Sequence, residues 1–206
     1  TALGLLMEAY PNKLKWWNGL QQERARVLLP LAWLIRVDDT PEHRAWLRRI
    51  AGDFLRCQDA CGAVREELGL PGNEYFRAQT SNAAYGTTET PLIQANGDPA
   101  CDLLYTLNSG FLGLHEAAAA TGDPELRKAE DRLAAFLCRI QTRSERHPEL
   151  DGTWLRAFDY GRWDYWASNA DAGWGAWCVE TGWVQGWLVT VLSLRQLHAS
   201  PGHRAA

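Results

Sequence analysis

The chain has 206 residues and a formal net charge of −4, and its 46% hydrophobic and 22% charged composition is that of an ordinary globular protein with one sizeable core. Its 21 Lys and Arg residues are scattered, whereas a nucleic-acid surface shows a basic patch or stripe, so we expect no nucleic-acid partner. The longest apolar run, residues 183–194, falls short of the about 20 residues that a bilayer crossing needs, which predicts no membrane span.

The five cysteines are an odd number and lack the paired short spacing of a zinc site; they are Cys57, Cys61, Cys101, Cys138 and Cys178. We therefore expect structural thiols, no metal site and no cofactor. The chain begins at Thr1, and nothing in the sequence assigns a compartment.

Apolar residues recur every three to four positions over long segments, which predicts helices. The expected helices cover residues 21–37, 41–58, 100–120, 124–143 and 172–198. Local turn signals separate the expected helix 21–37 from 41–58, and 100–120 from 124–143. Thr40 caps a helix that has Pro41 at its first position, and Gly122 ends one helix before Asp123 caps the next.

The turn signals recur at a regular spacing. Pro41 and Pro124 lie 83 residues apart, Pro124 and Pro201 lie 77 apart, and Gln58 and Gln141 again lie 83 apart. The sequence therefore predicts repeated helical hairpins, each followed by a long connection.

Two connections, residues 62–98 and 147–171, are far longer than usual loops, and connections of this length are typically functional or disordered. Their aromatic content argues against disorder. Residues 152–158 are the best candidate for a short strand within them.

Tryptophan is concentrated in the last quarter of the chain, where residues 154–187 hold seven of the 11 tryptophans. The acids interleaved with them are Asp159, Asp164, Asp171 and Glu180. An aromatic face can stack on a sugar and a carboxylate can bind hydroxyls or move protons, but tryptophan is equally an ordinary core residue. The pattern is compatible with a carbohydrate site and with an aromatic core.

Repeated hairpins with long aromatic connections on one side resemble the (α/α) toroid of six-hairpin glycosidases and related polysaccharide lyases. The resemblance covers residues 20–200, with local support from the strings YGTTETPLIQANGDP (85–99) and DAGWGAWCVETGW (171–183). It implies an all-α fold in which inner helices ring a cleft and the connections line its mouth. Six hairpins need about twice this length. We therefore expect a single domain over residues 1–206 that forms about two and a half hairpins of a larger toroid.

Glycoside hydrolysis usually needs two carboxyl groups, and three residues are the catalytic candidates. Glu89 lies within a connection and has no helix to cap, and Asp164 lies between Trp163 and Tyr165, where we expect partial desolvation and hence a raised pKa. Glu180 is the third.

On a helix, Glu180 shares a face with Trp177, Trp183 and Trp187. Buried acids are rare unless paired. Glu180 therefore either bonds indole N–H or backbone groups structurally, or faces a cleft.

The connections also offer polar and aromatic side chains for binding a sugar. The substrate-binding candidates are Tyr85, Gln94, Asn96, Asp98, Tyr160, Trp163, Trp166 and Trp177. Asp98 and Asp171 have an alternative role as helix caps, Asp98 with Pro99 at the first helical position.

The preferred function is glycoside hydrolysis of an oligo- or polysaccharide. A lyase is the alternative within the same architecture, since Tyr85, Arg77, Tyr160 and Arg162 could supply a base and neutralise a uronate. An epimerase is expected to place histidines in its cleft, and it is disfavoured because His115 and His198 lie near helix ends instead. The further alternative is a non-catalytic helical repeat that binds glycan or protein.

An incomplete toroid would leave apolar helix faces exposed, which favours association with its own remainder or with a second copy. The sequence does not predict that the isolated chain is active.

Overall fold

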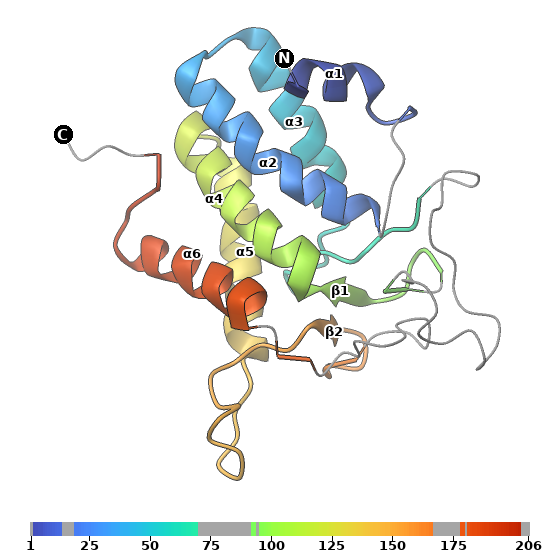
Figure 1. Cartoon of the computed structure of the whole chain (residues 1–206), viewed down its shortest axis with the longest axis vertical. Helices are drawn as coiled ribbons and strands as arrows, with labels where there is room; N and C mark the ends of the chain where they lie inside the picture. Colours follow the sequence, from blue (N-terminus) through green and yellow to red (C-terminus); the bar gives the residue numbers. More distant parts are fainter. Residues whose placement is uncertain are drawn as a thin grey trace.

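The computed structural model describes residues 2–13, 19–69, 92–93, 95–166, 178–179 and 181–202, and these residues are mostly helical, as predicted (Figure 1). The α-helices are α1 (Ala2–Ala9), α2 (Leu20–Val37), α3 (Pro41–Leu55), α4 (Asn108–Thr121), α5 (Pro124–Ile140) and α6 (Gly186–Gln196). Two π-helical turns, Leu103–Leu107 and Thr181–Gln185, lead into α4 and α6. Strands β1 (Ala100–Asp102) and β2 (Ala157–Asp159) form a small antiparallel sheet.

Helices α2 and α3 form one hairpin, and α4 and α5 form the next, with the predicted turn chemistry at both. The Thr40 hydroxyl accepts a hydrogen bond from the His43 N–H at 3.1 Å, and Asp123 Oδ1 accepts one from the Glu125 N–H at 2.9 Å. Gly122 ends α4 in the left-handed conformation at φ 70°, which glycine adopts without steric cost.

Helices α2 and α4 lie side by side and run in the same direction. Gly113 of α4 faces Leu28 of α2 so closely that an added Cβ would lie 2.5 Å from the Leu28 Cβ. Further along both helices, the Trp33 indole N–H donates to Glu116 Oε2 at 3.0 Å. Trp33 and Glu116 are 83 residues apart, so the spacing of the predicted repeat is also the offset at which the helices meet.

Contacts at nearly the same sequence offset connect α4 to the turn that follows α6. His115 lies 2.8 Å from the Ala199 carbonyl oxygen, and the Ser200 hydroxyl donates to Glu116; both pairs are 84 residues apart. Helices α2, α4 and α6 thus follow one another in a parallel row, with α3 packed on α2 and α5 packed on α4 (Figure 1).

The repeat extends into the segments that precede α2 and α4. The Leu20 N–H donates to the Glu67 carbonyl at 2.8 Å, and 83 residues later the Leu103 N–H donates to the Arg156 carbonyl at 2.8 Å. The start of α2 and the segment that leads into α4 are therefore each bound to backbone from the connection after the next helix.

The expected helix over residues 100–120 is wrong at its beginning. Residues Ala100, Cys101 and Asp102 pair instead with Asp159, Phe158 and Ala157. This pairing satisfies their backbone groups in the sheet, so the helical segment begins only at Leu103.

The residue that caps this helical segment is Asp102 rather than Asp98. Asp102 Oδ1 accepts from the Leu104 and Tyr105 N–H groups at 2.8 and 3.1 Å. Asp98 lies in a turn, where its Oδ2 accepts from the Ala95 N–H at 3.0 Å. The predicted strand over 152–158 is also displaced, to Ala157–Asp159.

The helices expected over 41–58 and 124–143 begin as predicted and end earlier, at Leu55 and Ile140. Gln58 pairs instead with Val64 in a bridge, and Thr142 exchanges backbone hydrogen bonds with residues 152 and 153. For the helix expected over 172–198, the described part is helical from Thr181 to Gln196.

Buried apolar side chains from α1 to α6 form one core cluster, which includes Met7, Leu28, Phe54, Phe136 and Val191. Trp154 belongs to it, with 2% of its surface exposed and its indole N–H donating to the Leu137 carbonyl at 2.8 Å.

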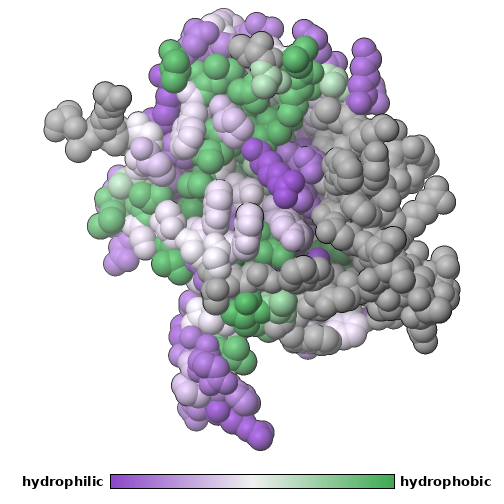
Figure 2. Space-filling model, viewed as in Figure 1, coloured by the Kyte–Doolittle hydropathy of each residue, from purple (hydrophilic) through white to green (hydrophobic). Residues whose placement is uncertain are grey.

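A hairpin formed by residues 141–153 projects from the end of α5 at the bottom of the view (Figure 1). Its surface is hydrophilic (Figure 2). Within the described residues, none of the helices combines the length and apolar character needed to cross a membrane.

Candidate functional site

Three segments from the two long connections meet at the N-terminal ends of α2 and α4. The Glu66 N–H donates to the Ala100 carbonyl at 2.9 Å, and the Tyr160 N–H donates to the Pro99 carbonyl at 2.9 Å. Residues 65–68, 95–102 and 156–166 therefore form one layer, which we call the connection layer.

Several predicted site residues lie in the connection layer: Asn96, Asp98, Tyr160, Trp163, Asp164 and Trp166. The others, Tyr85, Glu89, Gln94, Trp177 and Glu180, lie outside the described residues, as do Arg77 and Asp171. Of the three catalytic candidates, the structure therefore describes Asp164.

Asp164 is exposed to solvent, so the desolvation predicted for it is wrong. Its backbone N–H and carbonyl exchange hydrogen bonds of 3.1 and 2.9 Å with Asp159, which closes a tight turn over residues 160–163. Asp164 Oδ1 accepts from the Tyr165 N–H at 2.7 Å. The turn directs the carboxylate outward although both sequence neighbours are aromatic.

The aromatic neighbours of Asp164 are engaged with other side chains. Trp163 is 45% exposed and meets Phe136 and Phe158 edge to face, with ring centroids 6.0 and 5.4 Å apart. The Arg139 guanidinium lies 5.3 Å from the Trp163 ring centroid, within cation–π range. Trp163 thus presents a partly exposed ring that is fixed from several sides.

Trp166 and Tyr160 complete the aromatic part of the connection layer. The Arg162 guanidinium lies 5.2 Å from the Trp166 ring centroid. Tyr160 is half-buried, and burial raises the pKa of its hydroxyl to about 12, with a further contribution from the charge of Asp59. Tyr160 therefore stays protonated near neutral pH and can donate a hydrogen bond, but it is a poor base.

Asn96 and Asp98 hold the connection layer together. Asn96 Oδ1 accepts from the Leu68 N–H at 2.7 Å, which ties residues 65–68 to residues 95–98. Asp98 accepts from the backbone of its own turn. Both predicted substrate-binding residues therefore have structural partners.

Glu66 is a prominent acid of this layer that the sequence did not reveal. Its side chain is 2% exposed; Oε2 accepts from the Thr106 hydroxyl at 2.7 Å, and Oε1 accepts from the Gln21 and Glu67 N–H groups at 2.9 and 3.0 Å. Burial raises the pKa of Glu66 to about 7, and the charge of Asp102 adds to the rise, although the three hydrogen bonds oppose it. Glu66 thus joins α2 to the segment that begins α4.

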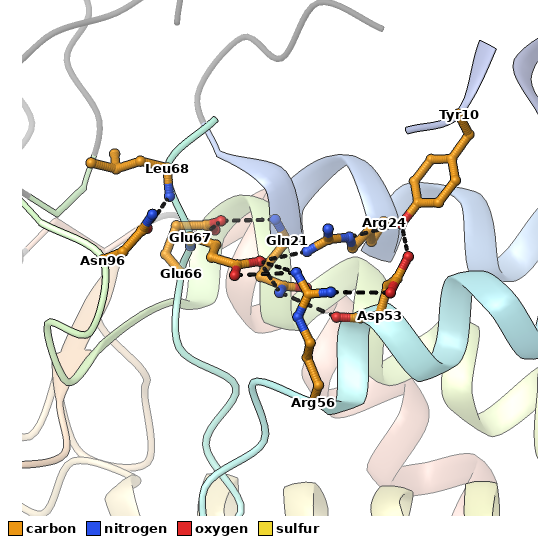
Figure 3. Close-up of polar contacts among 9 residues, drawn as sticks. All are labelled: Tyr10, Gln21, Arg24, Asp53, Arg56, Glu66, Glu67, Leu68 and Asn96. Carbon is orange, nitrogen blue, oxygen red and sulfur yellow. Dashed lines mark hydrogen bonds and ion pairs between the residues drawn. The ribbon is translucent and has the colours of Figure 1, made fainter. Parts of the chain in front are cut away.

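A charged network lies beside Glu66, on the side of α1 and α3 (Figure 3). Glu67 Oε2 lies 2.6 Å from Arg24 Nη1 and 3.0 Å from Arg56 Nη2. The Arg24 Nε–H donates to the Tyr10 hydroxyl at 3.0 Å, and that hydroxyl donates to Asp53. Burial, together with the hydrogen bond to Asp53, raises the pKa of Tyr10 to about 12. The network closes the start of α2 against α1 and α3.

One sequence signal could have suggested this buried polar region. The first turns of α2 are mostly polar, and three of their polar residues, Gln21, Gln22 and Arg24, are nevertheless buried. The side-chain partners of Gln21 and Arg24 come from the end of α1, from α3 and from the segment after α3, so the pairing itself is not readable from local spacing.

A cavity of about 480 Å³ lies at the other end of α4, between α4, α5 and the end of α6. Its lining residues are His115, Ala119, Arg127, Asp131, Arg195, His198, Ala199 and Ser200. The Arg195 guanidinium pairs with Glu130 and Asp131 at 2.7 Å each, and Arg127 pairs with Glu130 at 2.8 Å. The charged groups of this cavity are therefore largely paired among themselves.

A scan against protein-family models finds no match, and neither does a search of curated proteins. The fold and the connection layer are therefore the grounds for a functional proposal.

Proposed function

We propose that the chain is part of a carbohydrate-active (α/α)-toroid protein, with glycoside hydrolysis as its activity. The observation that carries the proposal is the parallel row of α2, α4 and α6, in which consecutive helices meet at offsets of 83 and 84 residues. At the N-terminal end of α4, the connection layer carries an exposed carboxylate, Asp164, beside partly exposed indoles. This arrangement is what the resemblance to six-hairpin glycosidases implies for a cleft mouth.

Each of the two other proposed acids lies close in the sequence to a described segment. Leu92, three residues after Glu89, packs in a small cluster with Ala100 and Ala157. Glu180 directly precedes the π-helical turn that leads into α6. We propose that one of these acids protonates the leaving oxygen while Asp164 acts as the base or nucleophile.

The test is hydrolysis of a panel of α- and β-linked oligosaccharides, followed by chromatography of the products. The variants to compare are Glu89→Gln, Asp164→Asn and Glu180→Gln. The matched control is Glu145→Gln, which changes an exposed acid of the projecting hairpin. Loss of a catalytic acid or base lowers kcat by about 10²- to 10⁴-fold, and the control should keep its rate.

The outcomes distinguish the activities. If an active chain keeps its rate in all three variants, the carboxylate assignment is wrong. An unsaturated uronate product would show that the chain is a lyase and not a hydrolase. If the panel yields no product at all, the hydrolase proposal fails.

A non-catalytic carbohydrate-binding module is the second candidate, and one observation favours it. The described acids Asp98, Asp159 and Asp164 all accept backbone N–H groups, as structural acids do. Titration calorimetry separates the candidates. A binding module should lose affinity in Trp163→Ala and Trp166→Ala, keep it in Asp164→Asn, and release no product.

A further inference from the structure

His115 lies in the last turns of α4 with 3% of its surface exposed, far from the connection layer along that helix. Its Nδ1 lies 2.7 Å from Glu130 Oε1 of α5. Its Nε2 lies 2.8 Å from the carbonyl oxygen of Ala199, in the turn that follows α6. One imidazole ring thus links three parts of the chain.

Both partners of this ring are acceptors. A backbone carbonyl cannot donate, and Glu130 is held ionised by two arginines. Burial alone would raise the pKa of Glu130, but the hydrogen bonds from His115 and Arg195, and their charges, outweigh it and lower that pKa. An imidazole that faces two acceptors needs an N–H on each nitrogen, which only the imidazolium has.

We propose that His115 is a pH-sensitive latch: its doubly protonated ring holds the turn 197–200 against α4 and α5, and loss of one proton releases that turn.

The charged groups around the ring come from every helix packed near it: Arg36, Glu116, Arg127, Glu130, Asp131 and Arg195. His198 is the other titratable group of the turn and is exposed. Burial lowers the pKa of His115, but the hydrogen bonds to Glu130 and Ala199 and the charges of Glu130 and Glu116 raise it further, so the net shift is upward. The latch is therefore closed below the ordinary histidine pKa of about 6.5 and opens as the pH rises through the raised value.

The contact to Ala199 is the one that opens. A neutral ring keeps its proton toward the carboxylate, which is the stronger acceptor. The bare Nε2 then faces the Ala199 carbonyl oxygen at 2.8 Å, which is repulsive. Because Ala199 and Ser200 line the cavity between α4, α5 and α6, release of the turn also opens that cavity.

Hydrogen exchange of the whole chain between pH 5.5 and 9 tests the latch, with rates corrected for intrinsic exchange. Exchange over residues 194–202 should rise by at most about tenfold per pH unit between the ordinary histidine pKa of about 6.5 and the raised pKa of His115, and level off above it, because one proton is released per opening. His115→Gln should remove this pH dependence, while His198→Gln, the matched control, should keep it. Exchange that does not change with pH in the native chain, or a dependence lost in His198→Gln, would overturn the proposal.

A measurement on the unmodified protein guards against a variant that does not fold. Nitrogen NMR of histidine-labelled protein reports whether each ring nitrogen carries a proton. We expect both His115 nitrogens to be protonated at pH 6.5. A single neutral tautomer at that pH would show that the latch does not exist.

Discussion

Glu66 is a carboxyl group enclosed at the joint between two helices. It accepts the Gln21 N–H at the start of α2, the N–H of its neighbour Glu67 and the hydroxyl of Thr106 before α4, so its acceptors are occupied from both sides. Such a group has two opposed effects, because the hydrogen bonds stabilise the joint while burial penalises the charge. The net contribution of Glu66 to stability therefore depends on pH, because only the ionised carboxylate carries the cost of a buried charge.

Substitution of Glu66 by Gln should make the protein less sensitive to alkaline pH. Burial raises the pKa of Glu66 to about 7 in the folded state, so its stabilising effect is complete below the ordinary glutamate pKa and is lost as the pH rises through about 7. Between pH 5 and 8 the native chain should lose roughly 2 to 3 kcal/mol relative to Glu66→Gln. Urea unfolding of both proteins across that range measures the difference.

The amide of Glu66→Gln keeps an acceptor for the Gln21 N–H, so the variant is expected to fold. Glu145→Gln, at an exposed acid, should follow the native pH dependence. Parallel stability curves for Glu66→Gln and the native chain would show that Glu66 does not titrate in this range.

At the scale of elements, the contact between α2 and α4 depends on the absence of a side chain at position 113. A Cβ there would lie 2.5 Å from the Leu28 Cβ and 3.2 Å from the Leu29 backbone nitrogen. Neither atom is the end of a flexible side chain, so the helices themselves would have to separate. We expect Gly113→Ala to destabilise the protein by about 1 to 3 kcal/mol, the usual range for overpacking, as measured by the midpoint of urea unfolding.

Gly52 of α3 provides the matched control, because a Cβ at that position meets nothing within 4 Å. Gly52→Ala should therefore stabilise the protein by about 0.5 to 1 kcal/mol through helix propensity alone. Equal effects of the two substitutions would contradict the close approach of α2 and α4.

The helix starts show where sequence rules suffice. Thr40 and Asp123 cap α3 and α5 as predicted, because a cap is decided within about three residues. Asp98 followed by Pro99 has the same local signature, yet no helix begins there. Pairing of Ala100–Asp102 with a strand 57 residues away decides that position, and such long-range pairing leaves no local signal.

The candidate site was less predictable than the helices. The aromatic neighbours of Asp164 suggested burial, but the turn over 160–163 points its carboxylate into solvent. Glu66 passed unnoticed because its partners Gln21 and Thr106 lie 45 and 40 residues away. Spacing reports which residues share a helix face; it does not report which faces meet.

At the scale of the molecule, one core extends from α1 to α6 across both hairpins and the sheet. A shared core favours a single cooperative unfolding transition. We expect unfolding followed by helical circular dichroism and by tryptophan fluorescence to coincide, with Trp154 reporting from within the core. Two separate transitions would show that the hairpins fold independently, as in an extended repeat array.

The projecting hairpin after α5 has a short counterpart after α3. Gln58 and Val64 close one such turn over five intervening residues, whereas Thr142 and Thr153 close the other over ten. In each turn, the backbone pairing of these closing residues fixes where the chain leaves one helix and returns to the core. The residues between them can therefore vary in number and kind without disturbing the packed helices. This position is therefore the natural place to insert a tag or a reporter, or to shorten the chain, when the protein is engineered for study.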